Sequence, residues 1–301
     1  MTIKQLTYDI STSLQPLYDP REAAAVASWY VCARLKMERY ELALRGNEPV
    51  DEALMTGIQQ DMQKLMEGCP VQYVLGETEF YGLPFRVSPA VLIPRPETEE
   101  LVQRIVQRYE RKPIRIWDVG TGSGCIAVSL AKMLPDAEVF ATDISEEALA
   151  VARENAERNR VGVTFVRHDM ADVENLPFGE TRFDVIVSNP PYIPASDRQQ
   201  MHKNVVDFEP ETALFVPDDD KLWCYRSLAL LAQCTLLPNG RLFVETYHDF
   251  HDELIALFSK HGLSDIQSIK DINGKTRFIE ALTLNHQNST INFTLTNRPV
   301  K

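Results

Sequence analysis

The stretch Asp118-Val119-Gly120-Thr121-Gly122-Ser123-Gly124 begins in an apolar run at residues 114–119 and ends where a segment of helical period, residues 124–133, starts. Glycines allow backbone conformations that other residues avoid, so the chain can come close to a ligand here. A turn at a helix start also leaves outward-pointing backbone N–H groups that can bind a ligand. These residues therefore predict a strand, a ligand-binding turn and a helix in succession.

Strands and helices alternate from this turn onward. Strands are expected at residues 114–119, 137–142, 163–167, 183–187, 240–245, 266–270 and 277–284. Helices are expected at residues 124–133, 145–158, 222–231 and 252–261. Asn239-Gly240 and Asn273-Gly274 indicate turns. The alternation is typical of βαβ units and predicts an α/β fold with a doubly wound, mostly parallel sheet.

The chain before this region shows two other patterns. Residues 1–70 have helical period and no cluster of ligand-type residues, which predicts a helical bundle that recognises a partner. Residues 71–93 hold short β-rich pieces around Gly82-Leu83-Pro84, which indicates a β-hairpin linker. Residues 94–284, opening with a helix from Pro96 to about Tyr109, would form the α/β domain. Residues 285–301 are polar without period, so a flexible tail is expected there.

Acidic residues follow the next two expected strands. Asp143 comes about 20 residues after the last glycine, where a carboxylate accepts hydrogen bonds from ribose hydroxyls. Asp169 follows the third strand at the same edge, where it could meet an adenine amino group while Met170 lies against the ring. The Gly-x-Gly-x-Gly spacing differs from that of dinucleotide binders and favours a nucleoside with little or no phosphate. A structural turn with a solvated Asp143 is the alternative.

An acidic Asp118 beside the glycines fits a cationic group better than a pyrophosphate. S-adenosylmethionine, with its sulfonium and ammonium, suits these features and is the predicted cofactor. The expected cofactor contacts are Asp118, Gly120, Thr121, Gly122, Ser123, Gly124, Asp143, Ile144, Asp169, Met170 and Asn189.

Ser188-Asn189-Pro190-Pro191-Tyr192-Ile193 directly follows the apolar run at residues 183–187. Ligands of open α/β sheets bind at this carboxyl edge of the strands. The two prolines remove two N–H donors and restrict the backbone, while Asn189 supplies an amide. The corner could thus grip a planar N–H donor such as a carboxamide or an exocyclic amine. A simple strand-ending turn is the alternative.

Composition narrows the class of protein. The 301 residues are 44% hydrophobic with a formal net charge of −12, and we find no basic run, so a phosphate backbone is a disfavoured partner. No signal peptide or membrane-spanning run is visible. The five cysteines are scattered without a C-x-x-C pair, which indicates reduced thiols of a cytoplasmic protein and no metal site.

The motifs together resemble those of class I methyltransferases with a Rossmann-like seven-stranded sheet. Leu92-Ile93-Pro94-Arg95-Pro96-Glu97-Thr98-Glu99 and Asp207-Phe208-Glu209-Pro210-Glu211-Thr212-Ala213-Leu214 narrow the resemblance to the HemK/PrmC family of bacterial release factor glutamine N5-methyltransferases. The resemblance implies methylation of the Gly-Gly-Gln glutamine of class I release factors, docked with help from the N-terminal helices. From the acidic charge we expect no direct binding of nucleic acid, and we also expect a monomer. Val216-Pro217-Asp218-Asp219-Asp220 departs from the Gly-rich acidic turn of many relatives.

The expected catalytic residues are Asn189, Pro190, Pro191 and Tyr192. Asn189 Oδ1 and the Pro190 carbonyl would accept the two amide N–H bonds, and Tyr192 would pack on the flat amide. Phe80 or Tyr81 could form a wall of the pocket, or simply belong to the core.

Three other functions stay open. The chain could methylate a glutamine of a large-subunit ribosomal protein, or an exocyclic amine of DNA or RNA, which an Asn-Pro-Pro-Tyr corner also serves. It could also bind the cofactor without catalysis.

Overall fold

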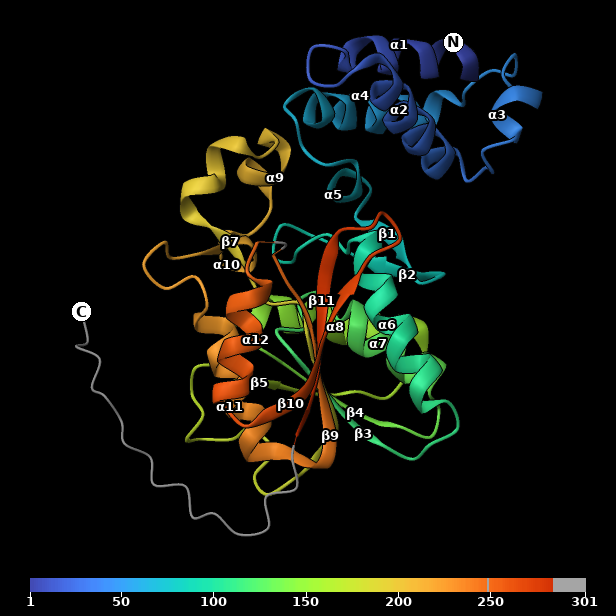
Figure 1. Ribbon diagram of the computed structural model, residues 1–301. Coiled ribbons are helices and arrows are strands. Elements are labelled where there is room, and N and C mark those ends of the chain that lie inside the picture. Colours follow the sequence, from blue (N-terminus) through green and yellow to red (C-terminus); the bar gives the residue numbers. More distant parts are fainter. Residues whose placement is uncertain (248, 284–301) are drawn as a thin grey trace.

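A seven-stranded sheet forms the centre of the larger part of the molecule (Figure 1). The computed structural model describes residues 1–247 and 249–283. Across the sheet the strands are β10 (Leu263–Lys270), β11 (Thr276–Thr283), β9 (Leu236–Glu245), β6 (Phe183–Ser188), β3 (Arg115–Val119), β4 (Glu138–Asp143) and β5 (Thr164–Arg167). The five strands from β9 to β5 are parallel, whereas β11 runs antiparallel to both β9 and β10. The predicted α/β fold with a mostly parallel sheet is confirmed.

Helices cover both faces of this sheet. On one face lie α6 (Pro96–Tyr109), α7 (Cys125–Met133) and α8 (Glu146–Asn159), and on the other lie α11 (Trp223–Thr235) and α12 (His251–Lys260) (Figure 1). Neighbouring residues of one strand serve opposite faces: Ile116 packs in the core with Leu101 of α6, whereas Trp117 packs with Tyr225 of α11. Because side chains alternate along a strand, an apolar run is buried on both sides.

One predicted turn is wrong. Asn239-Gly240 lies inside β9, which begins four residues earlier than expected at Leu236. Asn239 has a φ of +63°, and the pairing with β6 shifts register between Phe183 and Val185, so the Asn-Gly pair forms an irregularity within the strand. The Thr283 hydroxyl ties this irregularity to β11 by hydrogen bonds to the carbonyls of Leu237 and Gly240. The predicted Asn273-Gly274 turn does join β10 to β11.

The N-terminal residues form a separate helical layer with its own core. Its helices are α1 (Ile3–Leu14), α2 (Pro20–Leu35), α3 (Glu41–Leu44), α4 (Glu52–Met66) and α5 (Val71–Leu75). Asp19 and Asp51 cap α2 and α4 with their carboxylates. Val71 and Val74 of α5 are buried in this core, so the helical layer extends past residue 70 into a stretch where β-rich pieces are expected.

A hairpin of β1 (Glu77–Phe80) and β2 (Leu83–Arg86) connects the two parts. Phe80 and Tyr81 pack in the core beside α6 and α7, which matches the core alternative for these residues. Asn155 of α8 accepts from the Arg86 N–H at 2.6 Å and donates to the Ser123 carbonyl at 2.8 Å. The hairpin is thereby fixed to the glycine-rich turn.

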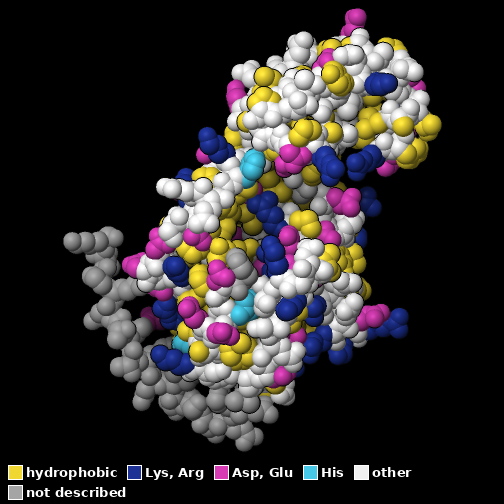
Figure 2. All heavy atoms as spheres, turned by 45° about the horizontal axis from the view of Figure 1, so that its top comes forward, with side chains coloured by type: hydrophobic (Ala, Val, Ile, Leu, Met, Phe, Trp, Pro, Cys, Tyr) yellow, Lys and Arg dark blue, Asp and Glu magenta, His cyan; other side chains and the backbone are white. Residues whose placement is uncertain are grey.

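A segment after β6 covers the carboxyl edge of the sheet. It contains β7 (Ile193–Pro194), a 3-10 helix (Ala195–Gln200), α9 (Lys203–Phe208), α10 (Glu211–Leu214) and β8 (Phe215–Val216). Its His202 stacks on Tyr18 of the helical layer, with ring centroids 5.7 Å apart. Figure 2 shows the surface hollowed between the helical layer and the sheet domain, with hydrophobic, basic and acidic side chains interspersed around the hollow.

None of the helices within residues 1–247 and 249–283 has both the length and the apolar character needed to cross a membrane. The expected flexible tail, residues 285–301, lies outside the described residues.

Candidate active site

A cavity of about 980 Å³ lies at the carboxyl edge of the parallel strands. Most of the predicted site residues line it: Gly120, Thr121, Gly122, Ser123, Asp143, Ile144, Asp169, Met170, Asn189 and Pro191. The predicted residues Asp118, Gly124, Pro190 and Tyr192 are not among its lining residues. The volume is at the upper end of the range for small-molecule sites.

The glycine-rich turn is held from below by β4. The N–H groups of Gly120 and Thr121 both donate to the Thr142 carbonyl, at 2.8 and 2.9 Å. Gly124 has a φ of +78° and is the N-cap residue of α7, and a Cβ there would lie 3.0 Å from the Ala152 Cβ of α8. Glycine is thus required by both conformation and space, because α8 packs against the backbone of the turn.

Asp143 binds the turn from the end of β4. Its Oδ2 accepts from the Gly122 N–H at 2.8 Å and its Oδ1 from the Ser145 N–H at 3.0 Å. Burial raises the pKa of Asp143 above its ordinary value. The adjacent Ile144 lines the cavity with 52% of its surface exposed. The end of β4 therefore offers a carboxylate and an apolar surface side by side, as a ribose and a base require.

The residues after β5 form the neighbouring wall. Asp169 accepts from the Ala171 N–H at 2.9 Å, and Met170 reaches back so that its Cε lies 3.5 Å from the position of a Cβ on Gly120. The end of β5 thus brings a second carboxylate and an apolar side chain to the cavity beside Gly120.

Asp118 lies beneath the turn, fully buried. Its Oδ2 accepts from the Thr121 hydroxyl at 2.6 Å and from the Ala127 N–H at 3.2 Å. Its Oδ1 is buried and has no hydrogen-bond partner among the described residues. Burial raises the pKa of Asp118 to about 7.

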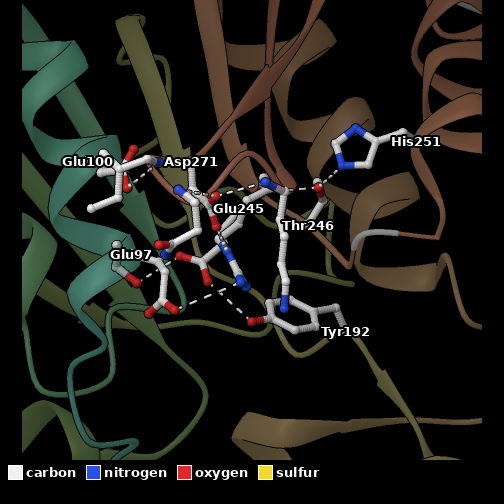
Figure 3. A network of polar contacts seen from close by, with 12 residues as sticks. Glu97, Glu100, Tyr192, Glu245, Thr246, His251 and Asp271 are labelled. Atoms are coloured by element: carbon white, nitrogen blue, oxygen red, sulfur yellow. Dashed lines mark hydrogen bonds and ion pairs between the residues drawn. The ribbon is translucent and has the colours of Figure 1, made fainter.

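Asn189 stands at the head of a chain of buried polar groups. Its Nδ2 donates to Thr98 Oγ1 at 3.2 Å, and Thr98 Oγ1 donates to Glu245 Oε2 at 2.7 Å. The other carboxylate oxygen of Glu245 accepts from the Tyr192 hydroxyl at 3.2 Å. Figure 3 shows Tyr192 pointing its hydroxyl at this carboxylate. The chain joins the first turn of α6, the end of β6 and the end of β9.

Glu245 is only 1% exposed, and burial raises its pKa to about 7. The positive charge of Arg277 and the bonds from Thr98 and Tyr192 oppose this rise. Arg277 is itself held by Asp271, 3.0 Å from its Nε. Burial and the negative charge of Glu245 raise the pKa of Tyr192, so its hydroxyl stays a donor.

Tyr192 lies beside the main cavity and lines a second one of about 300 Å³. Its ring centroid is 6.1 Å from that of Tyr247, whose hydroxyl donates to Asp197 at 3.0 Å. The packing of Tyr192 on an acceptor amide stays a prediction.

An ion pair joins the two family-type motifs across the mouth of the site. Arg95 Nη2 lies 2.7 Å from Glu209 Oε1, and Glu209 Oε2 accepts from the Ile93 N–H at 3.1 Å. The Glu209 side chain is 1% exposed, so it anchors the covering segment to the start of α6.

Sequence reasoning did not find this pairing, nor the roles of Thr98 and Glu245. Arg95 between two prolines signalled a fixed cation in need of an acidic partner. Glu245 ends a strand at the same edge as Asp143, so the rule that singled out Asp143 applies to it as well.

Comparison with known proteins covers both parts of the chain. Residues 10–76 match the family model of the PrmC N-terminal domain, and residues 116–208 match that of a methyltransferase domain. A release factor glutamine methyltransferase of Bacteroides thetaiotaomicron is 41% identical over 93% of this chain and 99% of that protein. One of Flavobacterium psychrophilum is 40% identical, again over 93% of this chain and 99% of its own length.

Two solved structures share the fold. A methyltransferase from Pyrococcus furiosus aligns with a TM-score of 0.50 and 19% identity over 78% of this chain and 100% of its own. A 16S rRNA methyltransferase of T. thermophilus in complex with AdoMet and guanosine aligns with a TM-score of 0.50 and 18% identity, over 69% of this chain and 49% of that one.

Proposed function

This chain belongs to the release factor glutamine methyltransferase family, and we propose that it methylates the Gly-Gly-Gln glutamine of class I peptide chain release factors. The methyl group of S-adenosylmethionine passes to the side-chain amide nitrogen, N5, of that glutamine. The observation that carries the proposal is the placement of Asn189, whose carboxamide lines the cavity beside the glycine-rich turn.

The lining of the cavity fits S-adenosylmethionine. Asp143 offers a carboxylate for ribose hydroxyls, and Ile144 and Met170 offer apolar surface for the adenine. The buried Asp118, with its unpartnered Oδ1, lies below the turn, where its ionised form favours a cationic ligand. When bound, the cofactor supplies an electrophilic methyl group on sulfur.

Asn189 positions the acceptor. A carboxamide nitrogen is a poor nucleophile because its lone pair is delocalised, so holding it in one pose supplies much of the rate. Asn189 Nδ2 is engaged by Thr98, while its Oδ1 accepts no hydrogen bond from the described residues. We propose that Oδ1 and the Pro190 carbonyl accept the two N–H bonds of the glutamine amide. The two acceptors stabilise the positive charge that develops on nitrogen.

The proposed partner is a protein. The net charge of −12 disfavours binding of a phosphate backbone, which argues against direct contact with nucleic acid. The helical layer, residues 10–76 of which match the PrmC N-terminal domain, is the proposed docking module for the release factor. We propose that the enzyme works in the cytoplasm, where a translation factor would be its substrate, and that it works as a monomer.

Transfer of labelled methyl to purified class I release factor, beside its Gly-Gly-Gln to Gly-Gly-Ala variant, tests the proposal. Label on the first and none on the second is expected. Label on a ribosomal protein or a nucleic acid, with none on the release factor, would move the function to that acceptor. Cofactor binding without transfer to any of them would indicate a scaffold.

A further inference from the structure

We propose that Glu245 and Thr98 are positioning residues that fix the Asn189 carboxamide with its oxygen toward the acceptor, and so select an amide over a carboxylate. The inference rests on the proposed function. It explains why Asn189 turns its Oδ1 toward the acceptor and not its Nδ2, although the two groups are nearly equal in shape.

The direction of the hydrogen bonds follows from the chemistry of the buried groups. Above its pKa of about 7 Glu245 is ionised and can only accept hydrogen bonds, so Thr98 gives its single hydroxyl proton to Glu245 Oε2, 2.7 Å away. The Thr98 oxygen can then only accept a hydrogen bond from its other neighbour, Asn189. Asn189 must therefore turn its Nδ2 toward Thr98, at 3.2 Å, and its Oδ1 remains for the acceptor.

The Glu245 carboxylate, where this series of hydrogen bonds ends, is held by groups from several elements. Tyr192 donates to its second oxygen at 3.2 Å, and the Tyr225 hydroxyl of α11 donates to the Glu245 backbone carbonyl at 3.2 Å. From β11 Arg277 faces it with a positive charge, and from α6 Glu97 faces it with a negative one. Glu245 is paired with Phe278 in the β9–β11 register, which fixes its backbone. Both oxygens of the Glu245 carboxylate thus accept hydrogen bonds, which fixes the orientation of the side chain.

The position of Glu245 in the sheet explains its reach. Val244 pairs with Ser188 in the parallel register of β9 and β6, so Glu245 and Asn189 each come one residue later at the same edge. Thr98, 1% exposed in the first turn of α6, bridges the two strand ends. The orientation of the Asn189 carboxamide therefore depends on residues from three elements, Asn189, Thr98 and Glu245, and requires all three.

Replacing the Glu245 carboxylate by an amide would reverse the direction of the hydrogen bonds and, with it, the orientation of the Asn189 carboxamide. In Glu245→Gln the new amide can donate to Thr98, whose proton is then free to go to Asn189 Oδ1. Asn189 would turn its Nδ2 to the acceptor, an arrangement suited to a carboxylate and unsuited to an amide.

The test uses the full-length protein, with release factor bearing Gly-Gly-Gln or Gly-Gly-Glu. Glu245→Gln and Thr98→Val are expected to lower kcat for methyl transfer by about 100-fold, the size seen when one preorganised hydrogen bond to a reacting group is lost. The KM for S-adenosylmethionine should be unchanged. Thr98→Ser, which keeps the hydroxyl, should restore kcat to within a few-fold of the wild type.

Matched controls separate positioning from general damage. Glu280→Gln removes another buried glutamate, on the neighbouring strand β11, that pairs with Arg108 and Arg241 away from Asn189. Thr235→Val removes a buried hydroxyl that donates to the Leu231 carbonyl of the same helix, α11. Both controls should keep kcat near the wild-type value.

Acceptor preference and pH give readouts that simple destabilisation would not move. Calorimetric affinity for the Gly-Gly-Glu variant relative to Gly-Gly-Gln should rise about tenfold in Glu245→Gln, the effect of about one hydrogen bond. Wild-type kcat should fall as the pH drops below about 7, where Glu245 takes up a proton, and Glu245→Gln should lack this acid limb.

Failure of the positioning role and failure of the proposed function give different results. Unchanged kcat and acceptor preference in both Glu245→Gln and Thr98→Val, in a wild-type background that methylates Gly-Gly-Gln, overturns the positioning role. A wild-type enzyme without transfer to Gly-Gly-Gln overturns the function instead. If Glu245→Gln does not fold, Thr98→Val decides alone.

Discussion

The two ends of the cavity are built in different ways. At the cofactor end, the contacts that shape the site join the glycine-rich turn to Thr142 and Asp143 on the adjacent strand, about 20 residues away in the chain. At the acceptor end, Asn189 bonds to Thr98 at a separation of 91 residues, and Thr98 to Glu245 at 147. The cofactor end is formed by contacts within one βαβ unit, whereas the acceptor end forms only when the whole domain has folded. Changes at the two ends should therefore separate binding of the cofactor from transfer of the methyl group.

The largest expected effect is at the acceptor end. Asn189→Ala removes the proposed acceptor of the glutamine N–H and should lower turnover by about 10³-fold, or about 4 kcal/mol of transition-state stabilisation. Methyl transfer assays measure the loss, and calorimetry should show nearly unchanged affinity for S-adenosylmethionine. Asn175→Ala, at an asparagine that bonds to Asp172 outside the cavity, is the control. Near-normal turnover of Asn189→Ala would remove this residue from the mechanism.

Next in size is the pH dependence of stability caused by the acceptor end. The folded pKa of Glu245 is raised to about 7 from an ordinary value of 4.5. The native state therefore keeps this proton longer than the unfolded chain, and the associated stability is present below pH 4.5 and lost as the pH rises through 7. The loss amounts to about 3 kcal/mol.

Glu245→Gln carries no such charge and should be more stable than the wild type at pH 8, with the difference shrinking towards pH 5. Urea unfolding at the two pH values measures it. The same variant should turn over poorly, which would show that the buried charge is retained for function at a cost in stability. A stability difference that does not change with pH would contradict the assignment of this pKa.

A third prediction concerns the cofactor end. Gly124→Ala forces a side chain into a left-handed conformation and against Ala152, and should lower the free energy of unfolding by about 3 kcal/mol. Gly82→Ala shares the positive φ, at +71°, but its Cβ would meet nothing within 4 Å, so only about 1 kcal/mol is expected. Denaturant titration of both variants isolates the close packing of α8. Equal losses would mean that backbone strain alone explains the glycine.

The smallest expected effect is on cofactor affinity. Asp143→Ala should raise the Kd for S-adenosylmethionine by about 10- to 100-fold, the effect of losing hydrogen bonds to a charged group. Turnover at saturating cofactor should change little, which is the reverse of the Asn189 result. Asp172→Ala, whose carboxylate bonds to Asn175 outside the cavity lining, serves as the control. An effect on kcat without one on Kd would place Asp143 at the wrong end of the site.

The sequence alone predicts much of the cofactor end. Strand and helix period, the glycines and the acid at the end of the next strand are all local patterns, and the α/β fold drawn from them is confirmed. Local patterns failed where long-range contacts decide, as at Asn239-Gly240. There an Asn-Gly pair reads as a turn, but the residues before and after it, Leu236 and Arg241, both pair with β6, so it lies within a strand.

What the sequence by itself determined is the chemistry available: a glycine-rich turn, an acid at the next strand end, and an Asn-Pro-Pro-Tyr corner that can grip an amide. Only the tertiary structure decided which way that grip faces. The orientation of Asn189 depends on the donor–acceptor direction of a chain through Thr98 to Glu245, on elements far apart in the sequence. A hydrogen bond needs its partners within about 3 Å, and no spacing along the chain specifies that meeting before the sheet and α6 have packed together.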